Sequence, residues 1–189
     1  MLLEEEKFMK NIKVILISVV AVLAIVLMCV FAVQGVQNKA ISLEEQVNTA
    51  ASDIEVQEKR RVDLIYNLVD CVKEYDKHEY ETLKDTVDAR SNSDAGIQET
   101  VTNIQATAEA YPELKSNENY KELMNELSMT ENMIAEYRSN YNKQIKEYKR
   151  YIRKFPNKQF LSMVGYEEIE YNYLEYDAPE TAPQNIFED

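Results

Sequence analysis

Glycine, proline, histidine and cysteine are all scarce in this chain of 189 residues, and tryptophan is absent. The three glycines and four prolines fall far below the usual shares of about 7% and 5%. Neither residue occurs between Gly35 and Gly96. Because strands joined by tight turns need such residues, the composition predicts an all-α protein.

The few residues that carry catalytic chemistry also limit what the chain can do. A metal site needs several convergent ligands, and the chain has one histidine and two cysteines. Cys29 falls in an apolar run and Cys71 lies far beyond it, so no disulfide framework is expected. The sequence contains neither a glycine-rich phosphate loop nor a Gly-x-Ser-x-Gly motif. We therefore expect no catalytic residues, no metal and no cofactor, and we predict that the protein is not an enzyme.

The formal net charge of −13 restricts the partners. A protein that binds nucleic acid needs clustered lysine and arginine to neutralise phosphates, so the charge argues against nucleic acid. It argues equally against electrostatic attachment of the acidic part to an anionic lipid surface.

One unbroken apolar run, from Val14 to Val33, dominates the N-terminal region. At about 1.5 Å per residue it would span roughly 30 Å, the thickness of the hydrocarbon core of a bilayer. The run therefore predicts a single transmembrane helix and makes the lipid bilayer a partner. A cleaved signal peptide is the alternative, but its apolar core is shorter and ends at an Ala-x-Ala site. Ala32-Val33-Gln34 is a poor match to such a site.

Lysines flanking the run indicate its orientation. Lys7, Lys10 and Lys13 precede it, whereas only Lys39 follows it closely. By the positive-inside rule, the N-terminus is expected in the cytoplasm and the domain outside.

The sequence divides into four parts: a stub at 1–13, the membrane helix at 14–33, a helical bundle at 34–166 and an acidic tail at 167–189. Apolar residues at helical spacing predict long helices in the bundle, with the membrane helix running on into the first of them. The spacing slips near Asp76 to Glu79, where we expect a kink or a new helix. Short connections make neighbouring helices antiparallel, which gives a bundle of three to four helices. The tail has too few apolar residues to bury and is expected to be mobile, although its tyrosines Tyr171, Tyr173 and Tyr176 could dock on the bundle or on a partner.

Four charged residues occupy positions on these apolar seams: Glu58 and Arg61 on the first helix, and Glu131 and Arg138 on the third. A buried charge without a partner is very costly, so these residues are expected to pair across the bundle. Arg61 with Glu131 is the first pairing we predict, and Glu58 with Arg138 the second. Such a buried ionic layer would fix the helix register. The competing interpretation is that these residues line a ligand cavity.

Two further patterns allow two interpretations each. His78 lies where the seam slips, and it is either a proton-responsive residue or an ordinary histidine at a helix end. Tyr120, Tyr141 and Tyr148 follow the third seam and either line a binding groove or belong to the core with their hydroxyls at its rim.

Two stretches of the chain resemble the bacterial LemA family. The first contains Val56-Gln57, Arg60-Arg61 and Asn67-Leu68-Val69, and the second, Ala108 to Tyr120, is similar to the family pattern AEAYPxLKxNxNF. The chain departs from the family at Tyr66, where proline is common, and at Lys149, where asparagine would complete a second Tyr-Asn pair. The residues that match the family motifs include Asn67, His78, Arg90, Tyr111, Pro112, Asn117, Tyr141, Asn142 and Pro156.

The resemblance implies a single-pass membrane protein with an antiparallel helical bundle and no established activity. Two function classes stay open. The first is a non-catalytic interaction or scaffolding protein of the bacterial cell envelope, with an unknown protein partner. The second is a ligand-sensing helical domain that signals through a partner protein. An apolar seam is also satisfied by a second copy of the chain, so a homo-oligomer stays possible.

Overall fold

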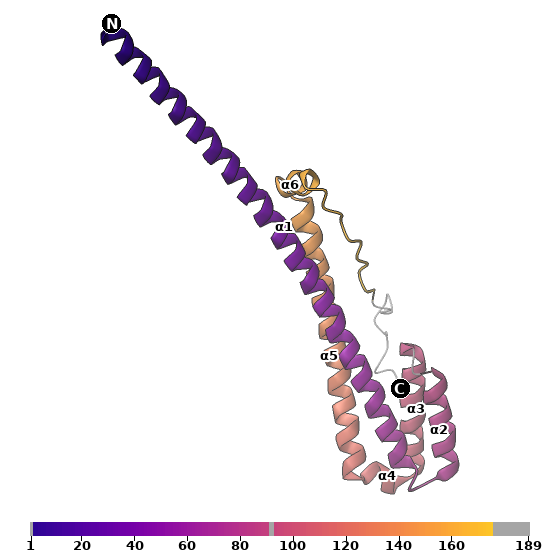
Figure 1. The fold of residues 1–189 in the computed structure, drawn as a ribbon. Helices are drawn as coiled ribbons and strands as arrows, with labels where there is room; N and C mark the ends of the chain where they lie inside the picture. Colours follow the sequence, from indigo (N-terminus) through magenta and orange to yellow (C-terminus); the bar gives the residue numbers. More distant parts are fainter. Residues whose placement is uncertain (1, 91–92, 176–189) are drawn as a thin grey trace, which may run out of the picture. The chain divides into compact units, whose positions relative to one another are not determined.

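The structure, a computed structural model, describes residues 2–90 and 93–175, with side chains from residue 11 onward. This part of the chain contains helices and no strand, which confirms the all-α prediction (Figure 1). The helices are α1 (Leu2–Val72), α2 (Lys77–Arg90), α3 (Asp94–Ala110), α4 (Pro112–Ser116), α5 (Glu118–Arg153) and α6 (Asn157–Met163).

The chain divides into two compact units where the sequence suggested a single bundle. Unit 1 consists of Met1–Val47 and Gln144–Asn172, and unit 2 of Asn48–Lys143 and Tyr173–Asp189. The long helices α1 and α5 each contribute to both units.

Helix α1 is continuous from the apolar run into unit 2, as the lack of a helix breaker indicates. Gly35 does not interrupt it. The helix ends at Val72, whose carbonyl accepts the backbone N–H of Tyr75 at 2.9 Å. Asp76 then caps α2, because its carboxylate accepts the backbone N–H of His78 at 2.8 Å and that of Glu79 at 3.1 Å. A new helix therefore begins where the slip in the seam predicts one.

The core of unit 2 contains side chains from all five of its helices. Helices α1 and α2 are antiparallel neighbours in this core. They are joined by residues 73–76, and the Tyr66 hydroxyl before this connection donates to Asp88, near the far end of α2, at 2.7 Å. The fully or nearly fully buried members include Ile65, Leu68, Val72, Leu83, Val87, Ile104, Leu114 and Leu127.

Capping residues position α3 and α5 in unit 2. Ser93 caps α3 by accepting the backbone N–H of Gly96 on its hydroxyl at 3.1 Å. Gly96 itself is packed so closely that an added Cβ would lie 2.3 Å from the carbonyl oxygen of Arg90. Asn117 caps α5 by accepting the backbone N–H of Tyr120 at 3.2 Å. The two caps therefore set the residues at which α3 and α5 begin.

Unit 1 packs the first residues beyond the apolar run against the end of α5 and against α6. Buried side chains of this unit include Ala40, Leu43, Val47, Ile145, Tyr148, Ile152 and Leu161. Tyr148 is fully buried and Tyr120 of unit 2 nearly so. For these two tyrosines the packing agrees with the core interpretation of the tyrosine seam.

The described part of the acidic tail is not free of the helices. In unit 1 the hydroxyl of Tyr166 donates to Glu44, the backbone N–H of Ile169 donates to the Tyr148 hydroxyl at 2.9 Å, and Lys149 donates to the Tyr171 carbonyl at 2.7 Å. Residues 167–175 therefore contact the helices, as docking of the tail tyrosines would require, although composition alone gives this segment little to bury. The expectation for residues 176–189 falls outside the described residues.

The polar contacts explain this attachment. In unit 2 the Asn142 amide donates to the Leu174 carbonyl and its oxygen accepts the Leu174 N–H, both at 2.8 Å. Composition counts the apolar side chains that a segment can bury, whereas this segment is attached through its backbone and its tyrosines.

An ionic cluster as candidate functional site

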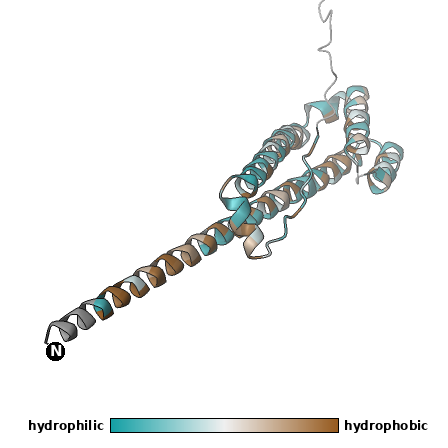
Figure 2. Cartoon of the chain, turned by 90° about the horizontal axis from the view of Figure 1, so that it is seen from above, coloured by the Kyte–Doolittle hydropathy of each residue, from teal (hydrophilic) through white to brown (hydrophobic). Residues whose placement is uncertain are grey.

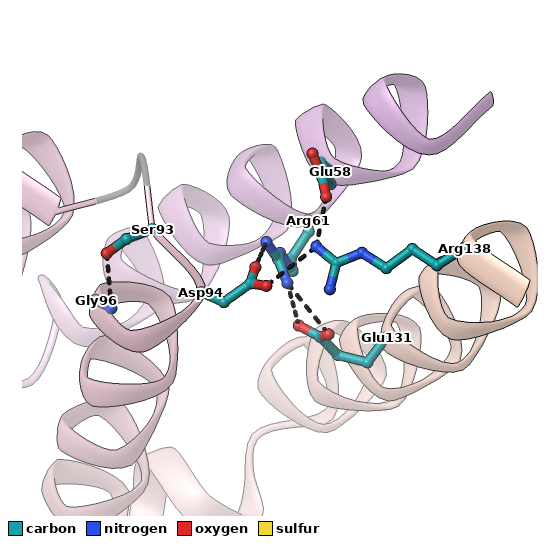
Figure 3. Close-up of polar contacts among 7 residues, drawn as sticks. All are labelled: Glu58, Arg61, Ser93, Asp94, Gly96, Glu131 and Arg138. Atoms are coloured by element: carbon teal, nitrogen blue, oxygen red, sulfur yellow. Dashed lines mark hydrogen bonds and ion pairs between the residues drawn. The ribbon is translucent and has the colours of Figure 1, made fainter. Parts of the chain in front are cut away.

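The charged seam residues lie close together in unit 2, where three helices converge (Figure 3). Glu58 and Arg61 come from α1, one turn apart on the same face. Glu131 and Arg138 come from α5. A fifth residue, Asp94, is the first residue of α3. We call these five residues the ionic cluster.

Both pairs indicated by the sequence are present. Nη1 of Arg61 lies 3.3 Å from Oε2 of Glu131, and Nη2 of Arg138 lies 2.6 Å from Oε1 of Glu58. Asp94 connects the two pairs, with one oxygen 2.7 Å from Nη2 of Arg61 and the other 3.0 Å from Nη2 of Arg138. Two guanidinium groups therefore bind three carboxylates in a continuous network.

Only one member of the cluster is buried, so the expected buried layer is corrected in this respect. The Arg61 side chain is 7% exposed, whereas Glu131 is 44% and Asp94 56% exposed. An arginine buries its aliphatic stem in the core and reaches polar groups with its planar head. The carboxylates can stay at the rim because the Arg61 side chain is long enough to reach them.

Asp94 was not recognised from the sequence as a cluster residue. It follows Ser93 at the start of α3, and either residue has the chemistry of a helix cap. In the structure Ser93 makes the capping hydrogen bond, which leaves the Asp94 carboxylate free to bind the two arginines. The sequence signal for this role is an acidic residue in the first turn of a helix, directly after another residue that can cap the helix.

The pKa values of the cluster follow its geometry. Partial burial by itself raises the pKa of Asp94, but hydrogen bonds and charge from Arg61 and Arg138 outweigh it, and the pKa lies below the ordinary 3.8. Burial likewise opposes the charged form of Arg138, and the carboxylates of Glu58 and Asp94 outweigh it and raise the pKa of this guanidinium. The pKa shifts of Asp94 and Arg138 therefore both favour the charged forms that pair with each other.

A pocket of about 460 Å³ opens beside the cluster and is lined by Glu58, Lys59, Arg61, Val62, Ser93, Asp94, Ile97 and Arg138. Nε of Arg61 is buried there without a hydrogen-bond partner. The five cluster residues carry one more negative than positive charge, so they do not form an anion site. Within the described residues, no group of three or more His, Cys, Asp and Glu side chains could hold a metal ion.

Two residues of the family motifs, Asn67 and Asn117, line a second pocket in unit 2, of about 350 Å³, together with Cys71. Asn119 donates to the Cys71 sulfur at 3.4 Å. Burial, together with the charges of Asp70 and Glu74, raises the pKa of the Cys71 thiol. The thiol therefore stays protonated, and a protonated thiol is a weak nucleophile.

Other motif residues hold connections between helices. The Tyr111 hydroxyl donates to Asp76 at 2.5 Å, and the Asn117 amide donates to the Tyr75 hydroxyl at 3.2 Å. Arg90 pairs with Glu99 on the surface, and His78 is exposed at the start of α2. Pro112 begins α4, Tyr141 is partly buried on α5, and Pro156 follows a cis peptide bond in unit 1.

Comparison with known proteins identifies the family to which these motifs belong. The family model described as the LemA family matches residues 50–187, more than half of the chain. A comparison with curated proteins gives no match. The family match covers unit 2 and confirms the resemblance seen in the two sequence stretches.

Proposed function

The chain belongs to the LemA family, and on this basis we propose that it is a single-pass membrane protein of the bacterial cell envelope. The helices that follow the apolar segment would act as a non-catalytic interaction or scaffolding module. The N-terminus would lie in the cytoplasm and these helices outside.

The apolar segment of α1 is the observation that carries this proposal. From residue 11 to residue 32 every described side chain is exposed, and α1 is long and apolar enough to cross a membrane (Figure 2). Leaving a single large apolar side chain in water forgoes about 1.5–3 kcal/mol. Summed over the segment, this exceeds the entire stability of about 5–15 kcal/mol that is typical of a domain. A hydrocarbon environment removes that cost for an isolated helix, because a helix satisfies its own backbone hydrogen bonds.

The continuity of α1 supports a role in presenting a domain near the bilayer. The helix passes from the apolar segment to Val72 without a break, and its second half contributes Ile65, Leu68 and Val72 to the core of unit 2. One helix therefore supplies both the apolar segment and part of the core of unit 2. Two exposed apolar side chains on unit 2, Val56 and Met129, are candidate contacts for a protein partner.

The pocket beside the ionic cluster favours a second candidate function, ligand sensing. Its lining combines charged groups with Val62 and Ile97, and a small polar ligand could bridge α1, α3 and α5 there. Because the cluster already pairs most of its own charge, such a ligand would have to replace existing ion pairs. Signalling would further require a partner protein to supply the output.

Membrane attachment is tested with an arginine in the middle of the apolar segment. Arginine at the centre of a membrane helix opposes insertion by about 2.5–3.5 kcal/mol, so Ile25→Arg should move part of the protein from the carbonate-resistant membrane pellet to the soluble fraction. Val56→Arg, at an exposed site on the same helix, is the matched control. Release of the unaltered protein by carbonate would contradict the proposal.

The interaction role is tested with a photo-crosslinking amino acid at Met129, and with the same probe at the exposed polar position Thr102 as control. A scaffolding protein should give one defined crosslinked band from Met129 in membranes. A small molecule that co-purifies with the detergent-solubilised protein, without such a band, would favour sensing instead.

A further inference from the structure

Unit 1 exposes apolar side chains at both ends of α6. Phe155, in the turn that precedes α6, is 75% exposed, and Met163, the last residue of α6, is 77% exposed. Val164, which follows α6, is also exposed, and Phe31 inside the apolar segment is exposed to a similar extent as Phe155. We call residues 154–164, which comprise the turn, α6 and Val164, the α5–α6 turn. Large apolar side chains left exposed in so short a segment are unfavourable in water.

The covered part of α1 begins where the apolar run ends. Residues 11–32 are exposed throughout, Val33 and Val36 are partly buried, and Ala40 is fully buried. The part of unit 1 that packs on α1 therefore reaches the end of the apolar run and stops there.

Two hydrogen bonds place the α5–α6 turn along α1. The Tyr148 hydroxyl lies 3.5 Å from Glu44, and the Tyr151 hydroxyl donates to the Val36 carbonyl at 3.4 Å. As residue numbers rise along α5 they fall along α1, so these segments are antiparallel (Figure 1). Helix α5 continues from Tyr151 to Arg153, about 3 Å closer to the apolar run at 1.5 Å per residue, and Phe155 lies in the turn beyond its end. The turn thus lies level with the last residues of that run.

The charge of this end is opposite to that of the chain as a whole. Between Tyr148 and Tyr166 the sequence has five basic residues and no acidic one, in a chain of net charge −13. Arg153 binds Glu168 at 2.7 Å and Lys149 binds a backbone carbonyl. Arg150, Lys154 and Lys158 face solvent.

We propose that the α5–α6 turn, residues 154–164, rests on the surface of the bilayer that α1 crosses, and that this surface contains anionic phospholipid. The inference depends on the membrane attachment proposed above. Phe155 and Met163 enter the boundary between headgroups and acyl chains, while Lys154 and Lys158 stay at the level of the phosphates. Apolar side chains beside lysines form the interfacial pattern of membrane-surface segments. The local positive charge also explains how a chain with a negative net charge can approach an anionic surface.

The absence of tryptophan allows a direct test in the full-length protein. Phe155→Trp introduces the only tryptophan of the chain at an exposed position, and its indole can be excited selectively in the presence of the thirteen tyrosines. The protein is reconstituted in vesicles of phosphatidylcholine and phosphatidylglycerol, with or without lipids brominated near the headgroup. Contact at the expected depth of about 5–10 Å should quench the emission at least about twofold. Met129→Trp, at a position that is also well exposed (65%) but lies in unit 2, is the control and should be unaffected.

Leu23→Trp separates the two proposals. If Leu23→Trp is quenched by lipids brominated deep in the chains and Phe155→Trp is not quenched at all, the surface contact is wrong while the membrane helix stands. If neither is quenched, the membrane attachment itself is wrong. A Phe155→Trp that iodide cannot reach and brominated lipid does not quench is covered by protein, which also overturns the inference.

The role of charge is tested with Lys154→Gln/Lys158→Gln in the Phe155→Trp background. Quenching should fall towards the level seen in vesicles of phosphatidylcholine alone, whereas Lys84→Gln/Lys115→Gln on exposed positions of unit 2 should leave it unchanged. Equal quenching of both pairs of variants would overturn the electrostatic part of the inference.

Discussion

Removing the two carboxylates that bind Arg61 should destabilise the protein more than removing Arg61 itself. The variant Asp94→Asn/Glu131→Gln preserves the shapes of both side chains and removes their charge. Arg61, 7% exposed, would remain buried without a counter-ion. Breaking a buried ion pair by removing one partner costs about 3–5 kcal/mol. We expect about 3 kcal/mol, because the amide oxygens still accept hydrogen bonds from the guanidinium.

Arg61→Met is the opposite perturbation. It leaves the charges of Asp94 and Glu131 without this partner, but 56% and 44% of those side chains are exposed and water can solvate them. Asp94 also keeps Arg138, at 3.0 Å. Methionine replaces most of the buried stem, and no buried charge is left behind. The expected loss is about 1 kcal/mol, the net value of an ordinary hydrogen bond.

The measurement is urea unfolding of the full-length protein in detergent micelles, followed by far-UV circular dichroism. The control is Glu126→Gln, which removes a pair between the exposed side chains of Arg60 and Glu126 at 3.7 Å and should cost at most about 0.5 kcal/mol. Adding Arg61→Met to the double amide variant should restore stability to near that of Arg61→Met alone. A double amide variant as stable as the Glu126→Gln control would refute the reasoning.

Three further predictions concern other features. Gly96→Ala should destabilise the protein by about 1–3 kcal/mol, since the added Cβ would lie 2.3 Å from a backbone oxygen. Gly35→Ala has open space around it and should instead stabilise helix α1 by about 0.5–1 kcal/mol. The same urea unfolding measures both variants. The pKa of Asp94 in the folded protein is lowered from 3.8. Its contribution to the free energy of unfolding is therefore complete above the unfolded pKa of about 3.9 and is lost as the pH falls through the folded pKa. In Asp94→Asn the free energy of unfolding should depend less on pH below about pH 4, as measured in acid titrations. Asn142→Ala removes both bonds to the Leu174 backbone, so hydrogen exchange of the Leu174 amide should quicken while global unfolding barely changes.

The sequence predicts those cluster residues that break an apolar pattern. Arg61 and Glu131 occupy seam positions where apolar residues belong, and because an unpaired buried charge is so costly, the pairing follows from the spacing alone. Their degree of burial does not follow in the same way. It depends on how far a long side chain extends to the rim, which the helical period does not record.

Features that depend on the ends of helices could not be derived from the sequence. Asp94 joins the cluster only because Ser93, its equal as a cap, takes the capping position. The slip in the seam places the break near Asp76 to Glu79, yet α1 already ends at Val72. The sequence leaves docking of the tail tyrosines open, but the particular contacts of residues 167–175 do not follow from it, since a single hydroxyl or backbone group that finds a partner leaves no periodic trace in a sequence.

The ionic cluster selects one register among several that the apolar seams alone would accept. A slip of α1 by one heptad would bring apolar residues of the two seams together again, since seven residues restore the face of a helix. The same slip would carry Arg61 about 10 Å along the axis, at 1.5 Å per residue, away from both Asp94 and Glu131. A buried guanidinium without counter-ions is then the cost of the wrong register. Because Asp94 belongs to α3 and Glu131 to α5, one arginine fixes the alignment of three helices, and any partner of unit 2 would bind to surfaces held in that alignment.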